Sequence, residues 1–264
     1  MRVAHQGVAG AFSEDAAIAL IGDAERIALP AFDDVFDAVS AGTVERGVVP
    51  IENTLAGSVH AVYDLLGRKD VKVIGETTVR ISHVLVGAPG ASIASLKHVR
   101  SHPMGLAQCE SFFRANPHIE PVAAYNTAGA IAEVVASGSI EEGALGSRRA
   151  AEQYGGVILA EGLEDDRENW TRFLLLAREL PEISGARKTS LLFTLPHRPG
   201  ALATALAALA GMNLTRIESR PIRGRPFEYA FYADVVSDGP LPSLDAVTTS
   251  LRVLGAFSVR SDRE

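Results

Sequence analysis

The chain has 264 residues, 47% of them hydrophobic and 22% charged, which is enough for two globular domains. Its formal net charge of −7 and its lack of a dense Lys/Arg cluster argue against a nucleic-acid binder, and no apolar run approaches the ~18 residues of a membrane helix. The single cysteine, Cys109, excludes an intrachain disulfide, and no signal peptide is recognisable, so we expect a cytoplasmic protein.

Residues 1–178 alternate between short apolar runs and helical patterns, which predicts α/β layering with mainly parallel strands. In the first lobe we expect Val3–His5, Arg26–Leu29 and Gly47–Ile51 as strands, with helices at Phe12–Leu20, Phe32–Ser40 and from a Ser58 cap to Leu66. Two extended runs follow between Val71 and Val86, with no helical pattern between them. They predict a crossing into a second lobe near residues 75–85, and clefts between lobes are common ligand sites.

The second lobe is expected to repeat this alternation and to return to the first lobe near residues 155–170. Its expected strands are His98–Arg100, Ile119–Ala123 and Gly143–Leu145, its helices Pro103–Phe113, Thr127–Ala136 and Arg148–Gln153, and Thr171–Ala177 follows as a buried strand. Residues 179–188 contain Pro, Gly and charges and predict a linker.

The last segment, residues 189–264, changes character. Its expected elements are a strand at Thr189–Leu195, a helix from Pro199 to Ala210, strands at Asn213–Arg220 and Glu228–Val236, a helix at Ser243–Leu254 and a strand at Phe257–Arg260. This βαββαβ order is the ferredoxin-like pattern. With both helices on one face of an antiparallel sheet, the other face and one edge would be free for pairing.

Polar residues follow most of the expected strands, where open α/β sheets bind their ligands. They are Gln6, Gly7 and Ser13, then Glu52, Asn53, Thr54 and Ser58, then Ser101, Asn126, Thr127 and Ser147. Free N–H groups at helix starts hold anions, so the inferred ligand is small, polar and carries carboxylates. Taken singly, Ser, Thr and Asn before helices are more often plain N-caps. Glu52 is harder to explain this way, because a carboxylate after an apolar strand is partly buried and needs a partner.

The segment Asn169 to Phe173 (NWTRF) is also unusual. In a strand, Thr171 and Phe173 share one face and Arg172 takes the other, although threonine is also favoured in strands for purely structural reasons. The seven histidines form no ligand cluster, and neither GxGxxG nor a Walker pattern is present, so we expect neither a metal nor a nucleotide. Cys109 is expected to be a small buried hydrophobe.

Several islands of the sequence resemble one family in order and spacing. QGVAGAFSEDA, VPIENTLAGSV, SHPMGLAQC, GALGSRRAAEQYG and NWTRF resemble the catalytic domain of prephenate dehydratases, and GALATALAAL and NLTRIESRP resemble the ACT domain attached to it. The resemblance covers nearly the whole chain. It implies a two-lobed fold like the type II periplasmic binding proteins, followed by a ferredoxin-like ACT domain, with the active site between the lobes.

The resemblance further implies conversion of prephenate to phenylpyruvate, with loss of water and carbon dioxide and without a cofactor. The family's catalytic residues map to Thr171, Glu52 and Asn53, and its substrate contacts map to Ser101 and Gln108, with Arg172 and Phe173 in the same motif. Sensing of L-phenylalanine maps to Gly200, Ala201, Leu202, Asn213, Leu214, Glu218 and Ser219. An effector held between two ACT domains makes a homodimer the minimum and a homotetramer the alternative.

The chain departs from the family pattern at a few positions. Met104 and Gly105 stand where the family has Gln and Ala, Phe12 where Tyr is common, and Thr54 where Ser is common. No chorismate mutase segment is recognisable, so the monofunctional form is expected.

Several alternatives stay open. Thr171 donates the proton to the leaving hydroxyl, or Glu52 does, with a pKa raised by burial. Arogenate dehydratase, prephenate decarboxylase and a non-catalytic small-molecule sensor are the rival functions, and the sign of the effect of phenylalanine is open.

Overall fold

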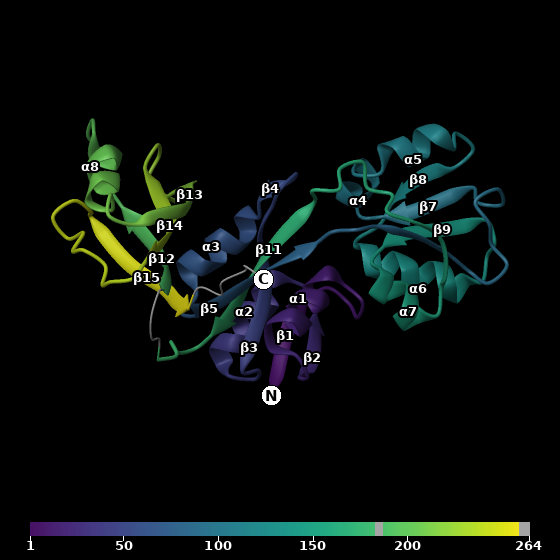
Figure 1. Ribbon diagram of the computed structural model, residues 1–264, viewed down its shortest axis with the longest axis horizontal. Coiled ribbons are helices and arrows are strands. Elements are labelled where there is room, and N and C mark those ends of the chain that lie inside the picture. Colours follow the sequence, from purple (N-terminus) through teal and green to yellow (C-terminus); the bar gives the residue numbers. More distant parts are fainter. Residues whose placement is uncertain (183–186, 259–264) are drawn as a thin grey trace.

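The computed structural model describes residues 1–182 and 187–258, and it consists of two α/β lobes and a C-terminal module (Figure 1). The first lobe contains β1 (Arg2–Gln6), α1 (Phe12–Ile21), β2 (Glu25–Leu29), α2 (Phe32–Ala41), β3 (Arg46–Asn53), β4 (Gly57–Ser58), α3 (His60–Arg68), β5 (Lys72–Arg80) and β11 (Trp170–Ala177). The second lobe contains β6 (Val84–Gly87), β7 (His98–Ser101), α4 (Pro103–Ala107), α5 (Glu110–Ala115), β8 (Glu120–Ala123), α6 (Thr127–Ser137), β9 (Glu142–Gly146), α7 (Arg148–Tyr154) and β10 (Val157–Glu161). The two-lobed α/β architecture expected from the sequence is thereby confirmed.

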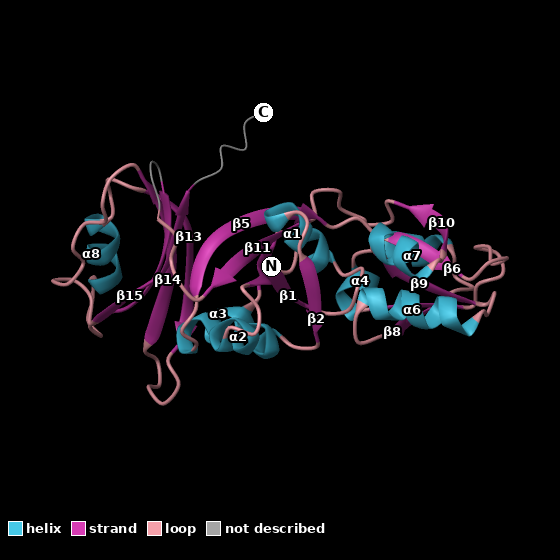
Figure 2. Ribbon diagram, turned by 90° about the horizontal axis from the view of Figure 1, so that it is seen from below, coloured by secondary structure: helices cyan, strands magenta, loops and turns pink. Residues whose placement is uncertain are grey.

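The C-terminal module contains β12 (Arg187–Thr194), α8 (Ala201–Ala208), β13 (Asn213–Pro221), β14 (Tyr229–Ser237) and β15 (Ser250–Ser258). Its strands continue the sheet of the first lobe in the order β13-β14-β12-β15-β5-β11-β3-β1-β2, while the second lobe has its own sheet, β10-β6-β9-β7-β8. Figure 2 shows that α8 covers one face of the module's sheet, whereas α2 and α3 lie together beside the first lobe's sheet.

The module and the first lobe share one hydrophobic core. Tyr232, Leu254 and Phe257 of the module pack in the same buried cluster as Tyr63 and Leu174 of the lobe. Gly255 pairs with Val73, and a Cβ at this glycine would collide with the backbone of Val73, so only glycine allows β15 to approach β5 this closely. The two units are therefore joined by both packing and strand pairing.

Two expected helices differ from the structure. Ser243–Leu254 is not a helix: a turn in which the carbonyl of Leu244 accepts from the N–H groups of residues 247 and 248 is followed by β15, which pairs with β12. The order of the module is thus βαβββ, because strand pairing with a central neighbour outweighs a weak local helical pattern. The expected helix Pro103–Phe113 breaks at Gln108, whose carbonyl accepts a 2.7 Å hydrogen bond from the N–H of Asp165.

Four smaller expectations also change. Ser58 does not cap α3; it lies in β4, opposite Glu52, and the N-cap position belongs to Val59. Strand β10 was missed, and β12 begins inside the expected linker, where Lys188 is 5% exposed. The expected strand Phe257–Arg260 falls within β15 up to Ser258, and its last two residues lie outside the described residues. Across the described ranges, no helix is long and apolar enough to cross a membrane.

Candidate active site

A register shift between β3 and β11 decides which side chains share a face of the sheet. Phe173 pairs with Pro50, but Arg172 pairs with Glu52, so the register skips Ile51. An extra residue in one strand turns all following side chains to the opposite face. As a result Asn53 lies opposite Thr171, and Glu52 lies opposite Arg172. The register therefore brings Asn53, and not Glu52, opposite Thr171, and the catalytic role expected for Glu52 stays a prediction.

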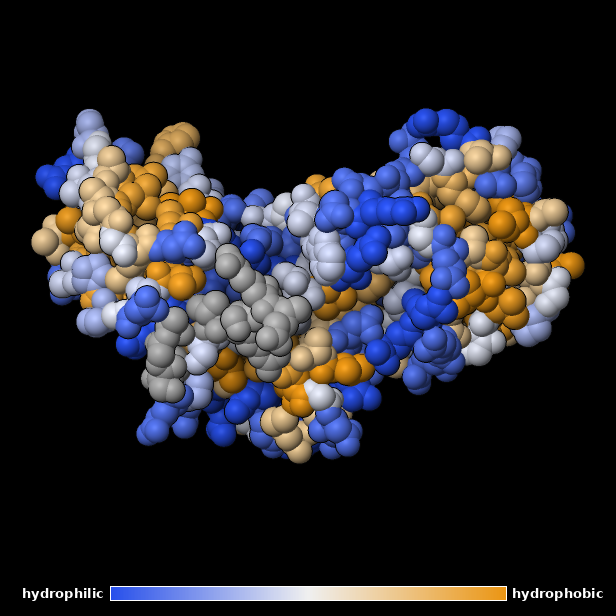
Figure 3. Space-filling model, viewed as in Figure 1, coloured by the Kyte–Doolittle hydropathy of each residue, from blue (hydrophilic) through white to orange (hydrophobic). Residues whose placement is uncertain are grey.

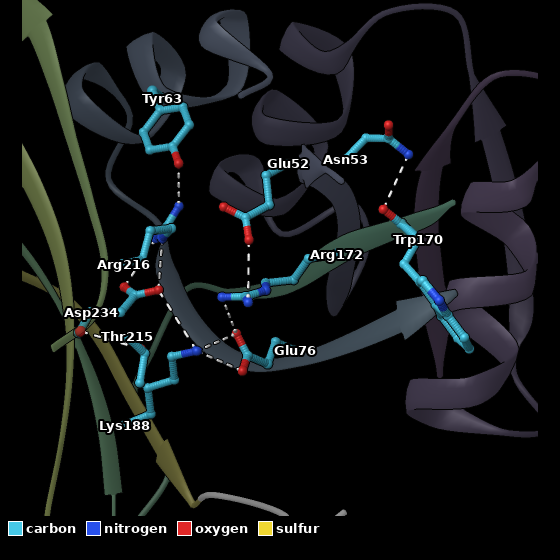
Figure 4. A network of polar contacts seen from close by, with 10 residues as sticks. All are labelled: Glu52, Asn53, Tyr63, Glu76, Trp170, Arg172, Lys188, Thr215, Arg216 and Asp234. Carbon is cyan, nitrogen blue, oxygen red and sulfur yellow. Dashed lines mark hydrogen bonds and ion pairs between the residues drawn. The ribbon is translucent and has the colours of Figure 1, made fainter. Parts of the chain in front are cut away.

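The Thr171 hydroxyl is held by an amide network. Asn53 Nδ2 donates to Thr171 Oγ1 at 3.0 Å, to Asn169 Oδ1 at 2.7 Å and to the carbonyl of Trp170 at 3.1 Å, the last of which Figure 4 shows. Asn53 Oδ1 accepts from the backbone N–H groups of residues 55 and 56 at 3.0 and 2.8 Å, which fixes the orientation of the amide. Because Asn53 supplies a donor to Oγ1, the proton of the Thr171 hydroxyl is free to be donated elsewhere.

Asn169 is a residue that the sequence reasoning did not select. Its side chain is fully buried, and its Nδ2 has no hydrogen-bond partner among the described residues. A buried donor without a partner is rare in native proteins, which sets Asn169 apart from the other residues of this network. The signal was present in the NWTRF island, where only Thr171, Arg172 and Phe173 were selected as site residues. Thr54 has a structural role. Its hydroxyl donates to the carbonyl of Glu168 at 2.7 Å, which links the residue after β3 to the segment before β11.

The opposite face carries a chain of alternating charges, shown in Figure 4. Arg172 lies 3.2 Å from Glu52 and 4.0 Å from Glu76, and Lys188 lies 2.7 Å from Glu76 and 4.0 Å from Asp234. Asp234 in turn pairs with Arg216 at 2.8 Å, and Arg216 donates to the Tyr63 hydroxyl at 2.7 Å. This charge chain joins the first lobe to the C-terminal module, so Glu52 and Arg172 belong to a structural ion network.

A pocket of about 200 Å³ lies beside Glu52 and Arg172. It is lined by Glu52, Asn53, Thr54, Gly57, Ser58, Thr78, Trp170 and Arg172, so it extends around the end of β3 to Asn53. Phe173 is not part of it. This side chain is 3% exposed and packs with Val3 and Val48 in the core beneath α1, which makes it a core residue and not a substrate contact.

Several side chains that were expected to bind the ligand form hydrogen bonds with backbone groups instead. Ser101 is fully buried and donates to the carbonyl of Leu145 at 2.9 Å. Asn126 and Ser147 cap α6 and α7 by accepting from backbone N–H groups at 2.6 and 3.0 Å, and Thr127 is the first residue of α6. Ser13 donates to the carbonyl of Gln6 at 2.5 Å. The side chains of Asn126 and Ser147 thus act as N-caps.

The loop at residues 6–12 belongs to the first lobe and contacts the second lobe. Gly7 has a φ of +112°, which favours glycine, and Gln6 donates to the carbonyl of Pro30 at 3.2 Å. The hydroxyl of Ser147 donates to the carbonyl of Gly10 at 2.5 Å, and the hydroxyl of Tyr154 donates to the same loop at 2.9 Å. Ser147 and Tyr154 therefore hold this loop against the second lobe, whereas the hydrogen bond of Gln6 lies within the first lobe.

His83 and Gln108 form a second polar pair, in the second lobe. His83 Nε2 lies 3.0 Å from Gln108 Oε1, and the imidazole packs edge-on against Phe12 of the first lobe, with ring centroids 5.7 Å apart. Burial lowers the pKa of His83, against the smaller opposing effects of Gln108 and Glu164. His83 is not among the residues expected from the sequence, because no motif around it marks a ligand site.

A larger pocket, of about 350 Å³, lies at the strands that cross between the lobes. It is lined by Arg80, Ser82, Val84, Arg148, Glu161, Gly162, Glu164 and Arg167. Its three guanidinium groups outnumber its two carboxylates, and guanidinium is well suited to binding carboxylates. Across residues 1–182 and 187–258, no three or more His, Cys, Asp or Glu side chains are grouped so that they could hold a metal.

The residues expected to sense an effector divide between two places. Ala201 and Leu202, which follow Gly200 at the start of α8, line a pocket of about 150 Å³ together with aromatic residues of β14 and the preceding turn. Glu218 does not line it: its carboxylate accepts from the Ser58 hydroxyl at 2.5 Å and thus contacts the first lobe. Asn213 and Leu214 begin β13, and Ser219 follows Glu218, so by strand alternation it points to the opposite face.

Comparison with known proteins decides the family. A family model described as Prephenate dehydratase matches residues 3–181. This chain belongs to the prephenate dehydratase family. It is an enzyme of the dehydratase class, a lyase, in a family of aromatic amino-acid biosynthesis.

Relatives of this dehydratase carry both substrate names. The chain is 41% identical to arogenate dehydratase/prephenate dehydratase 2, chloroplastic, of Arabidopsis thaliana, over 98% of this chain and 73% of that protein. It is 40% identical to arogenate dehydratase 2 of Petunia hybrida, over 97% and 71%.

Solved structures with a similar fold cover the full length of the dehydratase. A prephenate dehydratase from Arthrobacter aurescens in complex with L-Phe is 32% identical with a TM-score of 0.88, covering 100% of this chain and 92% of that one. A protein described as GqqA, a novel type of quorum quenching acylases, is 31% identical with a TM-score of 0.90, covering 100% of both chains.

Proposed function

We propose that this dehydratase converts prephenate to phenylpyruvate, with Thr171 as the proton donor to the departing hydroxyl. The observation that carries the proposal is the 3.0 Å hydrogen bond from Asn53 to Thr171 Oγ1. The Asn53 amide occupies one lone pair of the hydroxyl oxygen and stabilises negative charge on it as its proton moves. Glu52 does not lie opposite Thr171, because the register shift pairs it with Arg172.

The chemistry needs only a positioned acid. The ring carboxylate leaves as carbon dioxide, its bonding electrons form the aromatic ring, and the ring hydroxyl takes one proton from Thr171 and leaves as water. Thr171 then regains its proton from solvent. Positioned acid catalysis contributes about 10²–10⁴-fold, or about 3–5 kcal/mol. The dianionic substrate must be drawn to a protein of net charge −7, and the arginines Arg80, Arg148 and Arg167 at the crossing strands supply a local positive potential.

The direct test is to incubate purified protein separately with prephenate and with arogenate, and to measure phenylpyruvate and phenylalanine. We expect a higher kcat/KM for prephenate. A higher value for arogenate would shift the assignment to arogenate dehydratase, the activity in the names of several relatives. Product from neither substrate, together with turnover in a parallel acylase assay, would favour the activity of the GqqA-like structure.

We also propose that the C-terminal module is an ACT domain that binds L-phenylalanine near Gly200, Ala201 and Leu202. Support comes from the pocket at the start of α8 and from the related dehydratase whose structure holds L-Phe. Calorimetry with L-phenylalanine should show binding, and Leu202→Lys should abolish it. An unchanged binding isotherm for this variant would place the site elsewhere, and kinetics with added phenylalanine would give the sign of regulation.

A homodimer through the ACT domains follows from the same proposal, with a tetramer as the alternative. Apolar residues gather on this module at the left of Figure 3. Large apolar side chains that are exposed on the module include Leu202, Leu214, Ile217, Phe227, Tyr229 and Val253. Exposed apolar patches of this kind mark interaction sites. Size-exclusion chromatography with light scattering should give a dimer or tetramer, and a monomer would contradict the assignment. A cytoplasmic location stays a prediction, since relatives in Arabidopsis are named chloroplastic.

A further inference from the structure

Glu218 of the C-terminal module contacts the short strand that follows Asn53 in the first lobe. Its Oε2 accepts a 2.5 Å hydrogen bond from the Ser58 hydroxyl, and its Oε1 lies 3.5 Å from Nε2 of His60. Because a carboxylate can only accept, the hydroxyl proton of Ser58 points at Glu218. Hydrogen bonds to an ionised acceptor are stronger than those between neutral groups, so this contact holds Ser58 firmly.

Ser58 belongs to β4, a strand of two residues. β4 consists of Gly57 and Ser58 and pairs with Asn53 and Glu52 at the end of β3. Residues 54–57, which lead from β3 into β4, are exposed. An exposed turn has few buried contacts, so its stability depends on its hydrogen bonds. The hydrogen bond to Glu218 therefore fastens this hairpin on the side of its second strand.

The same turn orients the Asn53 amide. The N–H groups of residues 55 and 56 donate to Asn53 Oδ1 at 3.0 and 2.8 Å, and Asn53 Nδ2 donates to the carbonyl of Trp170 at 3.1 Å. Backbone groups have fixed donor and acceptor roles, so these contacts determine that Nδ2 is the end facing Thr171. Both residues of β4 also line the pocket of about 200 Å³ that Asn53 lines. A displacement of β4 would thus move the donors that fix this amide.

Glu218 is one of three charged residues that reach from β13 to the first lobe. Arg216, Glu218 and Arg220 occupy alternate positions, so their side chains share one face of the strand. Arg216 donates to the hydroxyl of Tyr63 in α3 (Figure 4), and Arg220 donates to both carboxylate oxygens of Asp64, also in α3, at 3.1 Å. Of the three, Glu218 is the one that contacts β4.

We propose that Glu218 is a positioning residue for the dehydratase: it reaches from the C-terminal module to β4 and keeps the Asn53 amide directed at Thr171. This inference rests on the proposed function, in which the Asn53 donor stabilises charge on the Thr171 oxygen as its proton moves. Without this contact the hairpin can shift, and the donor is no longer held at Oγ1 when the charge develops. The loss is confined to the transition state, so it falls on kcat and leaves KM nearly constant.

Truncation on either side of the contact should have the same effect. Glu218→Ala and Ser58→Ala should each lower kcat about 10-fold, the size expected for losing a hydrogen bond to a charged group, with KM within about 2-fold of the wild type. Glu218→Gln and Ser58→Thr keep the acceptor and the hydroxyl and should stay within about 3-fold of the wild-type kcat. The double variant Ser58→Ala/Glu218→Ala should be no slower than either single variant, because both remove one interaction. Losses that multiply in the double variant would overturn the proposal.

Arg220→Ala separates positioning from general attachment of the module. The side chains of Arg220 and Glu218 are both 22% exposed and lie on the same face of β13, but Arg220 is bonded to α3. Arg220→Ala should lower the melting temperature about as much as Glu218→Ala, yet keep kcat within about 2-fold of the wild type. An equal loss of kcat in both variants would contradict the inference. Should Glu218→Ala fail to fold, Ser58→Ala is compared with Arg220→Ala by the same criterion.

Hydrogen–deuterium exchange gives a readout that does not depend on turnover. Glu218→Ala and Ser58→Ala should speed exchange at the N–H groups of residues 55 and 56, which Asn53 protects, whereas Arg220→Ala should not. Unchanged exchange in the first two variants would refute the positioning role.

This outcome is distinguishable from a failure of the proposed function. If the wild type prefers arogenate, the same kcat ratios are measured with that substrate. If it turns over neither substrate, the proposed function fails, and the exchange rates at residues 55 and 56 alone decide whether Glu218 holds the hairpin.

Discussion

The side-chain amide of Asn53 and the hydroxyl of Thr171 are 3.0 Å apart across two antiparallel strands, and they meet because the register of those strands skips Ile51. The amide is fixed at its oxygen by two backbone N–H groups, so its donor side points at Oγ1 in a single orientation. A preorganised donor of this kind stabilises charge that develops on the oxygen without reorganising during the reaction.

Removing the Thr171 hydroxyl should abolish most of the catalysis. Thr171→Ala is expected to lower kcat by about 10²–10⁴-fold, the contribution of a positioned acid, while KM changes little. Thr171→Ser keeps the hydroxyl and should retain at least about one tenth of the wild-type kcat. Steady-state kinetics of the two variants check this, and near-normal turnover by Thr171→Ala would remove Thr171 from the mechanism.

Changing the Asn53 amide to a carboxylate should act on Thr171 without unfolding the chain. Asn53→Asp can still accept from residues 55 and 56, but it loses the donor to Thr171 and Asn169. We expect kcat to fall about 100-fold. Asn116→Asp, which removes an amide donor to the Phe112 carbonyl at 2.9 Å, is the matched control and should leave kcat unchanged. A similar loss in both variants would point to general destabilisation.

Glu52→Gln should lower kcat modestly without changing the pH dependence of the rate. The substitution breaks the 3.2 Å ion pair with Arg172, which is partly exposed, so we expect kcat to fall by less than about 10-fold. The pH–rate profile should keep the shape of the wild-type profile. A changed shape in Glu52→Gln, but not in Glu76→Gln from the same charge chain, would instead make Glu52 the proton source.

Truncation of Asp234, the buried partner of Arg216, should strongly lower the free energy of unfolding. Asp234 is 1% exposed and binds Arg216 through two hydrogen bonds of 2.8 and 3.0 Å. Burial alone lowers the pKa of Arg216, but Asp234 outweighs it and the pKa is raised. Asp234→Ala leaves a buried charge without its partner and should cost about 3–5 kcal/mol in the free energy of unfolding.

A surface ion pair provides the control for that measurement. Glu110 and Arg114 lie 3.0 Å apart on α5, and both side chains are largely exposed. Glu110→Ala should change the free energy of unfolding by less than about 0.5 kcal/mol in the same denaturant titration. Equal effects of the two truncations would mean that the Asp234–Arg216 pair stabilises the fold no more than a surface ion pair does.

Stability should fall on mild acidification because two buried histidines resist protonation. Burial lowers the pKa of both His5 and His83. Between about pH 6.5, where an unfolded histidine titrates, and the lower pKa of the folded state, the unfolded chain binds more protons, so stability decreases as the pH falls. Denaturant titrations from pH 7.5 to 5 should show this decline, and it should be smaller in His5→Gln. An identical pH dependence in that variant would exclude His5 as a cause.

The family, the two lobes and the positions of most strands and helices in the first 178 residues could be read from the amino-acid sequence. These features depend on local patterns: apolar runs set the strands, periodic apolar positions set the helices, and motifs such as NWTRF keep their spacing. Asn53 and Thr171 were selected from the sequence alone, and their side chains do meet. Glu52 was selected by the same local logic; it pairs with Arg172, and its catalytic role stays a prediction.

The tertiary structure decided the features that depend on a distant partner. The register shift at Ile51 arises only when β11, more than a hundred residues later, pairs with β3, and it exchanges the faces of Glu52 and Asn53. Ser250–Ser258 forms a strand because β12 accepts it on one side and Gly255 lets β5 approach on the other. Local sequence determines which conformations a segment prefers, but pairing and burial against the rest of the chain determine which side chains meet.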